Sequence, residues 1–265
     1  MALYTTETVL QTHHWSPKLF SFRTSRPATL RFENGQFLML GLQAGEKRIV
    51  RAYSIASANY EEYLEFYSIK VPGGALTSRL QNIREGSPIL ISSKPTGTLV
   101  LRDLRPGKRL LLLATGTGVA PFMSILKDPA TYEAFERVML VRGVRLCSDL
   151  AYADTVLESV RNDEYLGDIV RAQLLDYPCV SREAFRNTGR VTTALESGRA
   201  LSDLGISPLD PGTDRVMICG NMDMLADCRR ILDSRGFNIS PQIGVPGDYV
   251  IERAFAESIE RDAAA

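Results

Sequence analysis

Two short segments combine residue types whose chemistry and spacing suit nucleotide binding. The first, Thr115–Pro121 (TGTGVAP), follows a continuous apolar run at 109–115 and precedes a helical pattern at 121–126. Glycines at such a turn let the backbone approach a pyrophosphate, and the amino end of a helix favours its negative charge. Pro121 suits a first helical turn. The segment predicts a nucleotide-binding turn, although Gly-x-Gly alone would also allow a plain strand–helix turn.

The second segment is Arg51–Ala52–Tyr53–Ser54, which lies in a stretch of β pattern. Taken alone, it is compatible with an ordinary strand that exposes one arginine. Together with the later glycine turn, the segment favours a flavin site, because Arg-x-Tyr-Ser resembles the flavin signature of a known protein family.

Length and composition place these segments in a two-domain protein. The chain has 265 residues, 45% apolar and 23% charged, which is typical of a globular protein. Its formal net charge is zero, so no general attraction to nucleic acid or anionic lipid is expected. Residues 1–100 carry eleven Lys and Arg against seven Asp and Glu, and 101–265 carry twenty against twenty-four. A basic first half would suit an acidic protein partner.

The cysteine and histidine pattern predicts no metal site. The four cysteines, Cys147, Cys179, Cys219 and Cys228, show neither CxxC nor iron–sulfur spacing. The two histidines provide too few ligands. The start of the chain lacks a basic region followed by an apolar stretch, and no apolar run is long enough to span a bilayer. We therefore expect a cytoplasmic protein with reduced thiols and no membrane association.

The first hundred residues have the pattern of short strands separated by Gly and Pro turns, which predicts a small antiparallel barrel. A turn at 33–35 is expected to join paired strands, and a short helix is expected at 77–83. The expected strands lie at 30–42, 49–55, 63–71, 89–92 and 98–101.

Beyond residue 108 the pattern alternates between strands and helices, which predicts a parallel, doubly wound sheet. The expected strands are 109–115, 136–141, 167–174 and 215–219, and the expected helices are 121–126, 150–160 and 222–235. We therefore divide the chain into a β-barrel domain (1–102), a polar linker (103–108) and an α/β domain (109–265).

Nearly the whole chain resembles the bacterial branch of the ferredoxin–NADP⁺ reductases. The order and spacing of the matching segments make the resemblance specific. These segments are RAYSIAS (51–57), YSIKVPGGALTSRL (67–80), KPTGTL (94–99), LLLLATGTGVAPFMSIL (110–126), VRGVR (141–145), SRE (181–183), TGRVT (188–192), CGNMDM (219–224) and IERAF (251–255). The resemblance implies an FAD-binding barrel, an NADP-binding α/β domain, and a meeting of flavin and nicotinamide between them.

The resemblance also implies roles for particular residues in the flavin site. Arg51 would hold the FAD pyrophosphate, Tyr53 would pack on the isoalloxazine, and Ser54 would lie near flavin N5. A C-terminal segment with Ala254 and Phe255 would cover the flavin, although the chain continues beyond it. The other implied FAD-binding residues are Ala52, Tyr67, Ile69, Lys70, Gly73, Gly74, Leu76 and Thr77.

For the nucleotide, the resemblance implies contacts from Thr117 and Gly118. Arg145, Arg182 and Arg190 would hold the 2′-phosphate of NADPH. Cys219 would lie beside the nicotinamide, with a buried structural cysteine as the alternative. The implied catalytic residues are Ser54, Tyr53, Cys219, Glu252 and Ala254.

The implied activity is hydride transfer from NADPH to FAD, followed by single-electron transfer to ferredoxin or flavodoxin; we expect a monomer. The flavin carries this chemistry, so no general base is required. Three alternatives stay open: a non-catalytic flavin electron-transfer subunit, the reductase component of an oxygenase system, and a free-flavin reductase. The three arginines favour NADPH binding over the first, and the cysteine pattern disfavours an iron–sulfur arm.

Overall fold

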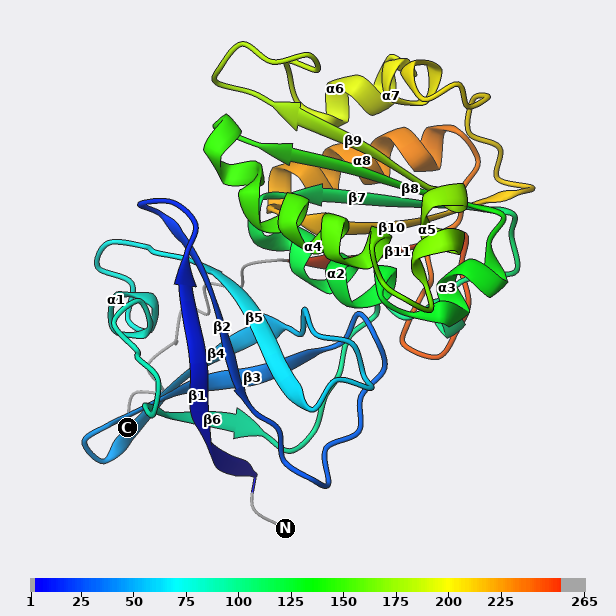
Figure 1. Ribbon diagram of the computed structural model, residues 1–265. Helices are drawn as coiled ribbons and strands as arrows, with labels where there is room; N and C mark the ends of the chain where they lie inside the picture. The colour runs from blue at the N-terminus through cyan, green and yellow to red at the C-terminus, as the bar shows by residue number, and fades with distance from the viewer. Residues whose placement is uncertain (1–2, 254–265) are drawn as a thin grey trace, which may run out of the picture.

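The structure, a computed structural model, describes residues 3–253. It contains two sheets, one in each of two domains that lie against each other (Figure 1). One has six antiparallel strands in the order β4-β3-β6-β1-β2-β5, and the other has five parallel strands in the order β11-β10-β7-β8-β9. The predicted fold class, a β-barrel followed by a doubly wound domain, is confirmed. Ala254 and Phe255 lie outside the described residues.

The first domain closes its strands around an apolar interior. Phe20, Phe22, Leu38, Leu40 and Phe66 are all almost completely buried there. A short helix, α1, lies beside the barrel and contributes Leu80 to the same core. The elements are β1 Tyr4–His14, β2 Leu19–Ser25, β3 Phe37–Ala44, β4 Lys47–Ser54, β5 Tyr63–Ile69, α1 Thr77–Leu80 and β6 Pro88–Ser92.

Several expected elements of this domain were wrong in detail. The turn at 33–35 precedes β3, and the hairpin joins β3 to β4 through Gly45–Glu46, where Gly45 has φ +62°. Residues 98–101 form no strand; a 3₁₀ turn, η1 (Leu101–Asp103), begins at the last of them. The second segment buries Leu99 and Val100 without joining the sheet, so burial was mistaken for strand pairing. The sequence pattern also missed β1 and β2.

The second domain is a three-layer sandwich (Figure 1). Helices α2, α4 and α5 cover one face of its sheet, and α6 and α8 cover the other. Both faces need cover because successive buried leucines of β7 point alternately to the two faces, each into a separate apolar cluster. The strands are β7 Arg109–Thr115, β8 Arg137–Val144, β9 Leu174–Val180, β10 Asp214–Gly220 and β11 Tyr249–Arg253. The helices are α2 Ala120–Leu126, α3 Pro129–Ala134, α4 Ala151–Arg161, α5 Gly167–Gln173, α6 Val191–Glu196, α7 Arg199–Asp203 and α8 Met222–Ser234, with 3₁₀ turns η2 Gly116–Val119 and η3 Cys147–Leu150.

The strand expected at 167–174 is helix α5 instead, and β9 begins where that helix ends. The helix buries Val170 and leaves Asp168 and Arg171 exposed. In a segment this short, the sequence pattern of such a helix does not differ clearly from that of a strand. Pro178 lies within β9, which is tolerated because β9 is an edge strand.

The two domains share one continuous apolar cluster rather than a hinge. Leu19, Ala56, Tyr67 and Leu99 from the barrel side pack in the same cluster as the buried face of α2 and α4. The buried hydroxyl of Ser124 on α2 lies 2.7 Å from the carbonyl of Ser57 and 2.9 Å from Oδ1 of Asn34. This interface sets the position of β5 relative to the glycine turn after β7, which β5 contacts.

Among residues 3–253, no helix has the length and apolar character needed to cross a membrane. Within the same part of the chain, no three His, Cys, Asp or Glu side chains are grouped so as to hold a metal ion.

Candidate functional site

The end of β4 places a tyrosine and an arginine in different environments. The hydroxyl of Tyr53 lies 3.1 Å from Ser68 Oγ on β5, and its ring meets Phe66 edge-on at a centroid distance of 6.4 Å. Burial raises the pKa of Tyr53, so its phenol stays neutral. Arg51 donates to the carbonyl of Val50 over 2.8 Å and forms no ion pair with any residue in 3–253. Its remaining donors are available to an anion.

The segment after β5 folds into a compact loop that ends at α1. Gly74 N donates to the carbonyl of Val71 over 3.0 Å, and Thr77 Oγ1 donates to the same carbonyl over 3.3 Å. A Cβ on Gly74 would meet Thr77 Oγ1 at 2.4 Å, so this position needs glycine. Gly73 has φ +75°, and a Cβ there would meet no atom within 4 Å. The loop thus presents open backbone, as close approach of a phosphate requires.

Three predicted flavin residues contribute to this region chiefly through packing or backbone. Tyr67 stacks on Tyr152 of α4 at a centroid distance of 4.0 Å and an interplanar angle of 17°. Ile69 packs against the interdomain cluster, and Leu76 is buried in front of α1. The side chains of Tyr67 and Leu76 are buried in this packing, and that of Ile69 is half-buried beside it. Lys70 is tied by its N–H to the carbonyl of Lys18 over 2.7 Å.

The glycine turn after β7 is a 3₁₀ turn, η2, before α2 begins at Ala120. A Cβ on Gly118 would meet the carbonyl oxygen of Cys219 at 2.4 Å, so glycine permits the close approach of this turn to the end of β10. The exposed Gly116 has φ +55° and open space beside it.

Thr115 was not predicted as a site residue, yet its hydroxyl is the most suggestive atom near this turn. Thr115 Oγ1 is buried and has no hydrogen-bond partner within residues 3–253. A Cβ on Gly220 would meet it at 2.4 Å, so it lies between the glycine turn and the end of β10. An orphaned buried hydroxyl beside open glycine backbone fits a polar ligand such as a dinucleotide. The only sequence signal for it was its position directly before Gly116.

Cys219 and Glu252 lie side by side on neighbouring parallel strands, where the register pairs them directly. Cys219 is completely buried, and burial, with a smaller effect of the Glu252 charge, raises the pKa of its thiol. Glu252 Oε2 accepts a 3.1 Å hydrogen bond from Thr98 N, and Thr98 Oγ1 donates to the carbonyl of Ile251 over 2.9 Å. Thr98 comes from the barrel side, so this junction joins the two domains. Burial raises the pKa of Glu252 to about 8.

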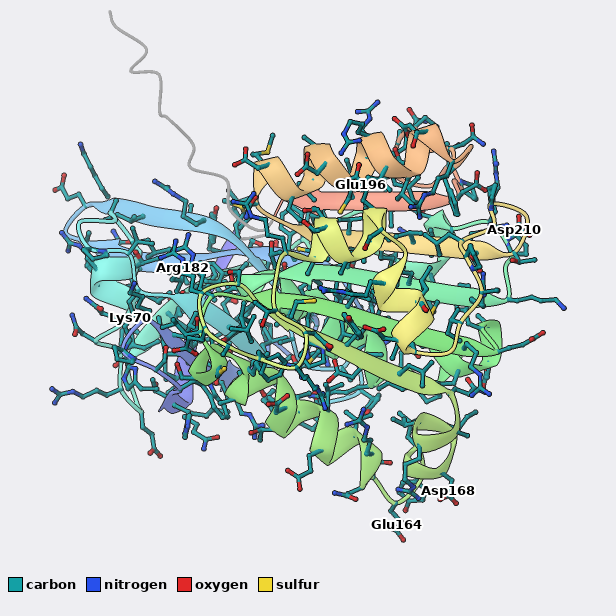
Figure 2. All side chains as sticks on the ribbon, turned by 90° about the horizontal axis from the view of Figure 1, so that it is seen from above. Lys70, Glu164, Asp168, Arg182, Glu196 and Asp210 are labelled. Carbon is teal, nitrogen blue, oxygen red and sulfur yellow. The ribbon has the colours of Figure 1, made fainter. Side chains whose placement is uncertain are left out.

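The carboxyl ends of β8 and β9 bring the three predicted arginines to one edge of the sheet. Val144 pairs with Val180, and Val180 forms a bridge to Thr188. Arg145 follows Val144 directly, and Arg182 and Arg190 each lie two residues beyond Val180 and Thr188. Within residues 3–253, these three exposed guanidinium groups make no ion pair and no side-chain hydrogen bond. Figure 2 shows Arg182 on the same side of the molecule as Lys70 in that view.

Arg142, on β8 just before this edge, differs sharply from Arg145. It is buried and donates to both carboxylate oxygens of Asp176 over 2.8 Å, and it also pairs with Asp154. Such pairing satisfies a structural arginine. The unpaired arginines at the sheet edge therefore have donors left for an external anion, whereas Arg142 does not.

Replacing Glu252 by glutamine should change the pH dependence of stability. The folded state holds the Glu252 proton up to about pH 8, whereas its ordinary pKa is 4.5. Below about pH 4.5, Glu252 is protonated in both the folded and the unfolded state, so it costs the folded wild-type protein nothing. As the pH rises from about 4.5 to about 8, the unfolded state releases this proton first, and the free energy of unfolding of the wild-type protein falls. We expect the unfolding temperature of Glu252→Gln to rise relative to wild type across this window.

The check is thermal unfolding of both proteins as purified, from about pH 5 to about pH 9. Glu158→Gln, at an exposed position on α4, is the control and should follow the wild-type curve. Parallel curves for wild type and Glu252→Gln would show that Glu252 titrates alike in the folded and unfolded states.

Known proteins similar to this chain agree with this geometry. Residues 8–100 match the oxidoreductase FAD-binding domain, and residues 112–230 match the oxidoreductase NAD-binding domain. A ferredoxin–NADP reductase from Pseudomonas aeruginosa is 56% identical over 95% of this chain and 98% of its own length. One from Azotobacter vinelandii is 54% identical over 95% of this chain and 97% of its own length.

A solved structure extends the comparison. The ferredoxin NADP⁺ reductase from Neisseria gonorrhoeae, with bound FAD and NADP, is 31% identical and has a TM-score of 0.86, covering 96% of this chain and all of that one. Two domain matches that together span most of the chain, and relatives of this identity along nearly its full length, show that this protein belongs to the ferredoxin–NADP reductase family.

Proposed function

We propose that this chain is an FAD-dependent reductase that oxidises NADPH and delivers single electrons to ferredoxin or flavodoxin. The observation that carries the proposal is the junction between the domains. There, Thr98 from the barrel side is hydrogen-bonded to β11, beside Cys219 and the glycine turn. Two half-sites, one suited to each cofactor, are thereby held face to face. Bound FAD would supply the conversion of a two-electron hydride into single-electron steps.

On the barrel side, we propose that Arg51 holds the FAD pyrophosphate and that the 70–77 loop lies along it. The support is the unpaired guanidinium of Arg51 and the open backbone at Gly73. Tyr53 would pack on the flavin ring while its hydroxyl stays bonded to Ser68, and Ala52 and Ser54 would border the ring. Ala254 and Phe255, which lie outside the described residues, would cover the flavin.

On the α/β side, we propose that Thr117 and Gly118 contact the nucleotide pyrophosphate and that the three sheet-edge arginines contact the 2′-phosphate. Cys219 would act through its shape beside the nicotinamide, because a thiol whose pKa is raised stays uncharged. Glu252 would hold a proton at its carboxyl group at neutral pH. A non-catalytic electron-transfer subunit would have no use for three unpaired arginines at this edge.

The purified protein should be yellow, and NADPH should bleach its flavin absorption. Arg51→Ala should lower the FAD-to-protein ratio after gel filtration, because the pyrophosphate loses its main cation. Arg48→Ala, an exposed arginine on the same strand, is the matched control. An unchanged ratio in Arg51→Ala would remove Arg51 from the site, and a colourless protein that cannot take up FAD would overturn the function.

Arg190→Ala should raise the KM for NADPH roughly ten- to a hundredfold and leave the KM for NADH nearly unchanged, since one charge-assisted contact is lost. Steady-state kinetics with both nucleotides provide the measurement. Arg186→Ala is the control, because Arg186 lies on the same connection but over the ring of Phe185. Equal losses with NADPH and NADH would mean that Arg190 supports the fold.

We propose further that the protein acts as a monomer and that an acidic electron carrier docks on the barrel, where the net charge of residues 1–100 is +4. Lys18, Lys70, His13 and His14 gather at the end of the β1–β2 hairpin. Burial and the positive charges of Lys70 and His13 lower the pKa of His14, so the lysines rather than His14 carry the positive charge of this surface. Such a surface would attract the partner weakly and transiently.

Ferredoxin reduction should therefore slow as salt is added, because exposed charges are screened beyond about 8 Å at physiological ionic strength. The measurement compares ferredoxin reduction with ferricyanide reduction across a salt series, the latter corrected for the charge of the acceptor. A ferredoxin rate that stayed level or rose would favour a mainly apolar contact.

A further inference from the structure

Backbone hydrogen bonds join the turn that follows β8 to the turn that follows β9, beside the unpaired arginines. Ser181 N donates to the carbonyl of Val144 over 3.1 Å, and Arg182 N donates to the carbonyl of Arg145 over 3.0 Å. These two bonds extend the strand pairing past the last residues of the sheet. They leave Arg145 and Arg182 as direct neighbours across the two turns.

A further hydrogen bond between these two turns involves a side chain. Cys147 N donates to Oε2 of Glu183 over 2.6 Å, at the point where the two backbones have separated. Without Glu183, this N–H would have no partner among residues 3–253, and the 145–147 turn would be held to the 181–183 turn from one side only. The exposed carboxylate thus replaces a backbone acceptor.

We propose that Glu183 is a positioning residue for recognition of the 2′-phosphate, because it fixes the spacing between Arg145 and Arg182. This inference rests on the proposed nucleotide site. Glu183 itself does not contact the phosphate. Two guanidinium groups held at a set spacing bind an anion better than two that must be ordered on binding, since less side-chain and loop entropy is lost.

The charge of Glu183 opposes this benefit. Its hydrogen bond from Cys147 N lowers the pKa of the carboxyl group, so Glu183 is ionised at neutral pH. A negative charge near a phosphate weakens phosphate binding, while the hydrogen bond strengthens it by ordering the arginines. Substitution separates the two effects: Glu183→Ala removes both, whereas Glu183→Gln keeps an oxygen acceptor for Cys147 N and removes only the charge.

The test measures equilibrium binding to the FAD-loaded protein by calorimetry, with 2′-phospho-ADP-ribose and ADP-ribose as probes. These probes lack the nicotinamide, so no reaction interferes. We expect Glu183→Ala to bind the phosphorylated probe about three- to tenfold more weakly than Glu183→Gln, since the two variants differ in the hydrogen bond and carry the same charge, and to bind ADP-ribose within about twofold of Glu183→Gln. Glu183→Gln should bind the phosphorylated probe as tightly as wild type or more tightly. The KM for NADPH should follow the same order, with kcat unchanged.

Glu164→Ala is the matched control, because it removes one exposed carboxylate from the same domain. Glu164 makes no hydrogen bond or ion pair within residues 3–253, and it lies far from Arg182 in Figure 2. It should bind both probes like wild type. A Glu183→Ala variant that binds the phosphorylated probe as tightly as Glu183→Gln does, or equal weakening of both probes, would overturn the proposal.

Arg145→Ala and Arg182→Ala distinguish this failure from a failure of the nucleotide site. If both weaken binding of the phosphorylated probe while Glu183→Ala binds it as tightly as Glu183→Gln, the arginine site stands and the positioning role of Glu183 falls. If neither arginine variant affects that probe, the 2′-phosphate site has been assigned wrongly, and the role of Glu183 falls with it.

Discussion

The packing of the barrel against helices α2 and α4 is the constraint on which the proposed site depends. Neither half-site is complete alone, because the barrel offers the Arg51–Ser54 strand end and the α/β domain offers the glycine turn. Tyr152 on α4 stacks on Tyr67 and also meets Trp15 edge-on at a centroid distance of 5.4 Å. The buried hydroxyl of Ser124 bonds across the same interface. A continuous, close-packed core resists sliding, so the two half-sites keep one relative position.

The fixed packing of the two domains buries polar groups of Glu252 and Thr115 near the junction. Glu252 has one hydrogen bond, from the barrel-side Thr98, and its raised pKa shows that burial outweighs that bond. The hydroxyl of Thr115 has no partner within residues 3–253. Natural proteins satisfy most buried polar groups, and exceptions gather where a ligand completes the site. These two groups flank Cys219, on either side of the end of β10, which is where the proposed function needs the two cofactors to meet.

The fold could be predicted largely from the sequence because the α/β half carries strong local signals. In the run at 109–115, every side chain that β7 buries is apolar. The helix predicted at 222–235 corresponds to α8, which ends one residue earlier. The errors arose where burial and strand pairing are separate. Leu99 and Val100 are buried but pair with no strand, and 167–174 buries Val170 through a helical face. The long β1 strand was missed because its side chains are mostly exposed and give little apolar alternation.

The candidate site was harder to predict because its chemistry depends on which partners a side chain finds. In the segment VRGVR, Arg142 and Arg145 are three residues apart and chemically identical. Only the tertiary structure shows that Asp176 and Asp154 neutralise the first, while the second projects beyond the sheet and pairs with no residue among 3–253. The aspartates come from β9 and α4, and no local pattern links them to Arg142. An exposed arginine without an internal partner is inexpensive for folding, because water solvates it, and it keeps its full set of donors for a ligand. Selectivity for a phosphate can therefore be placed at the sheet edge without straining the core, which explains why the paired arginine lies inside the sheet and the unpaired ones lie beyond its end.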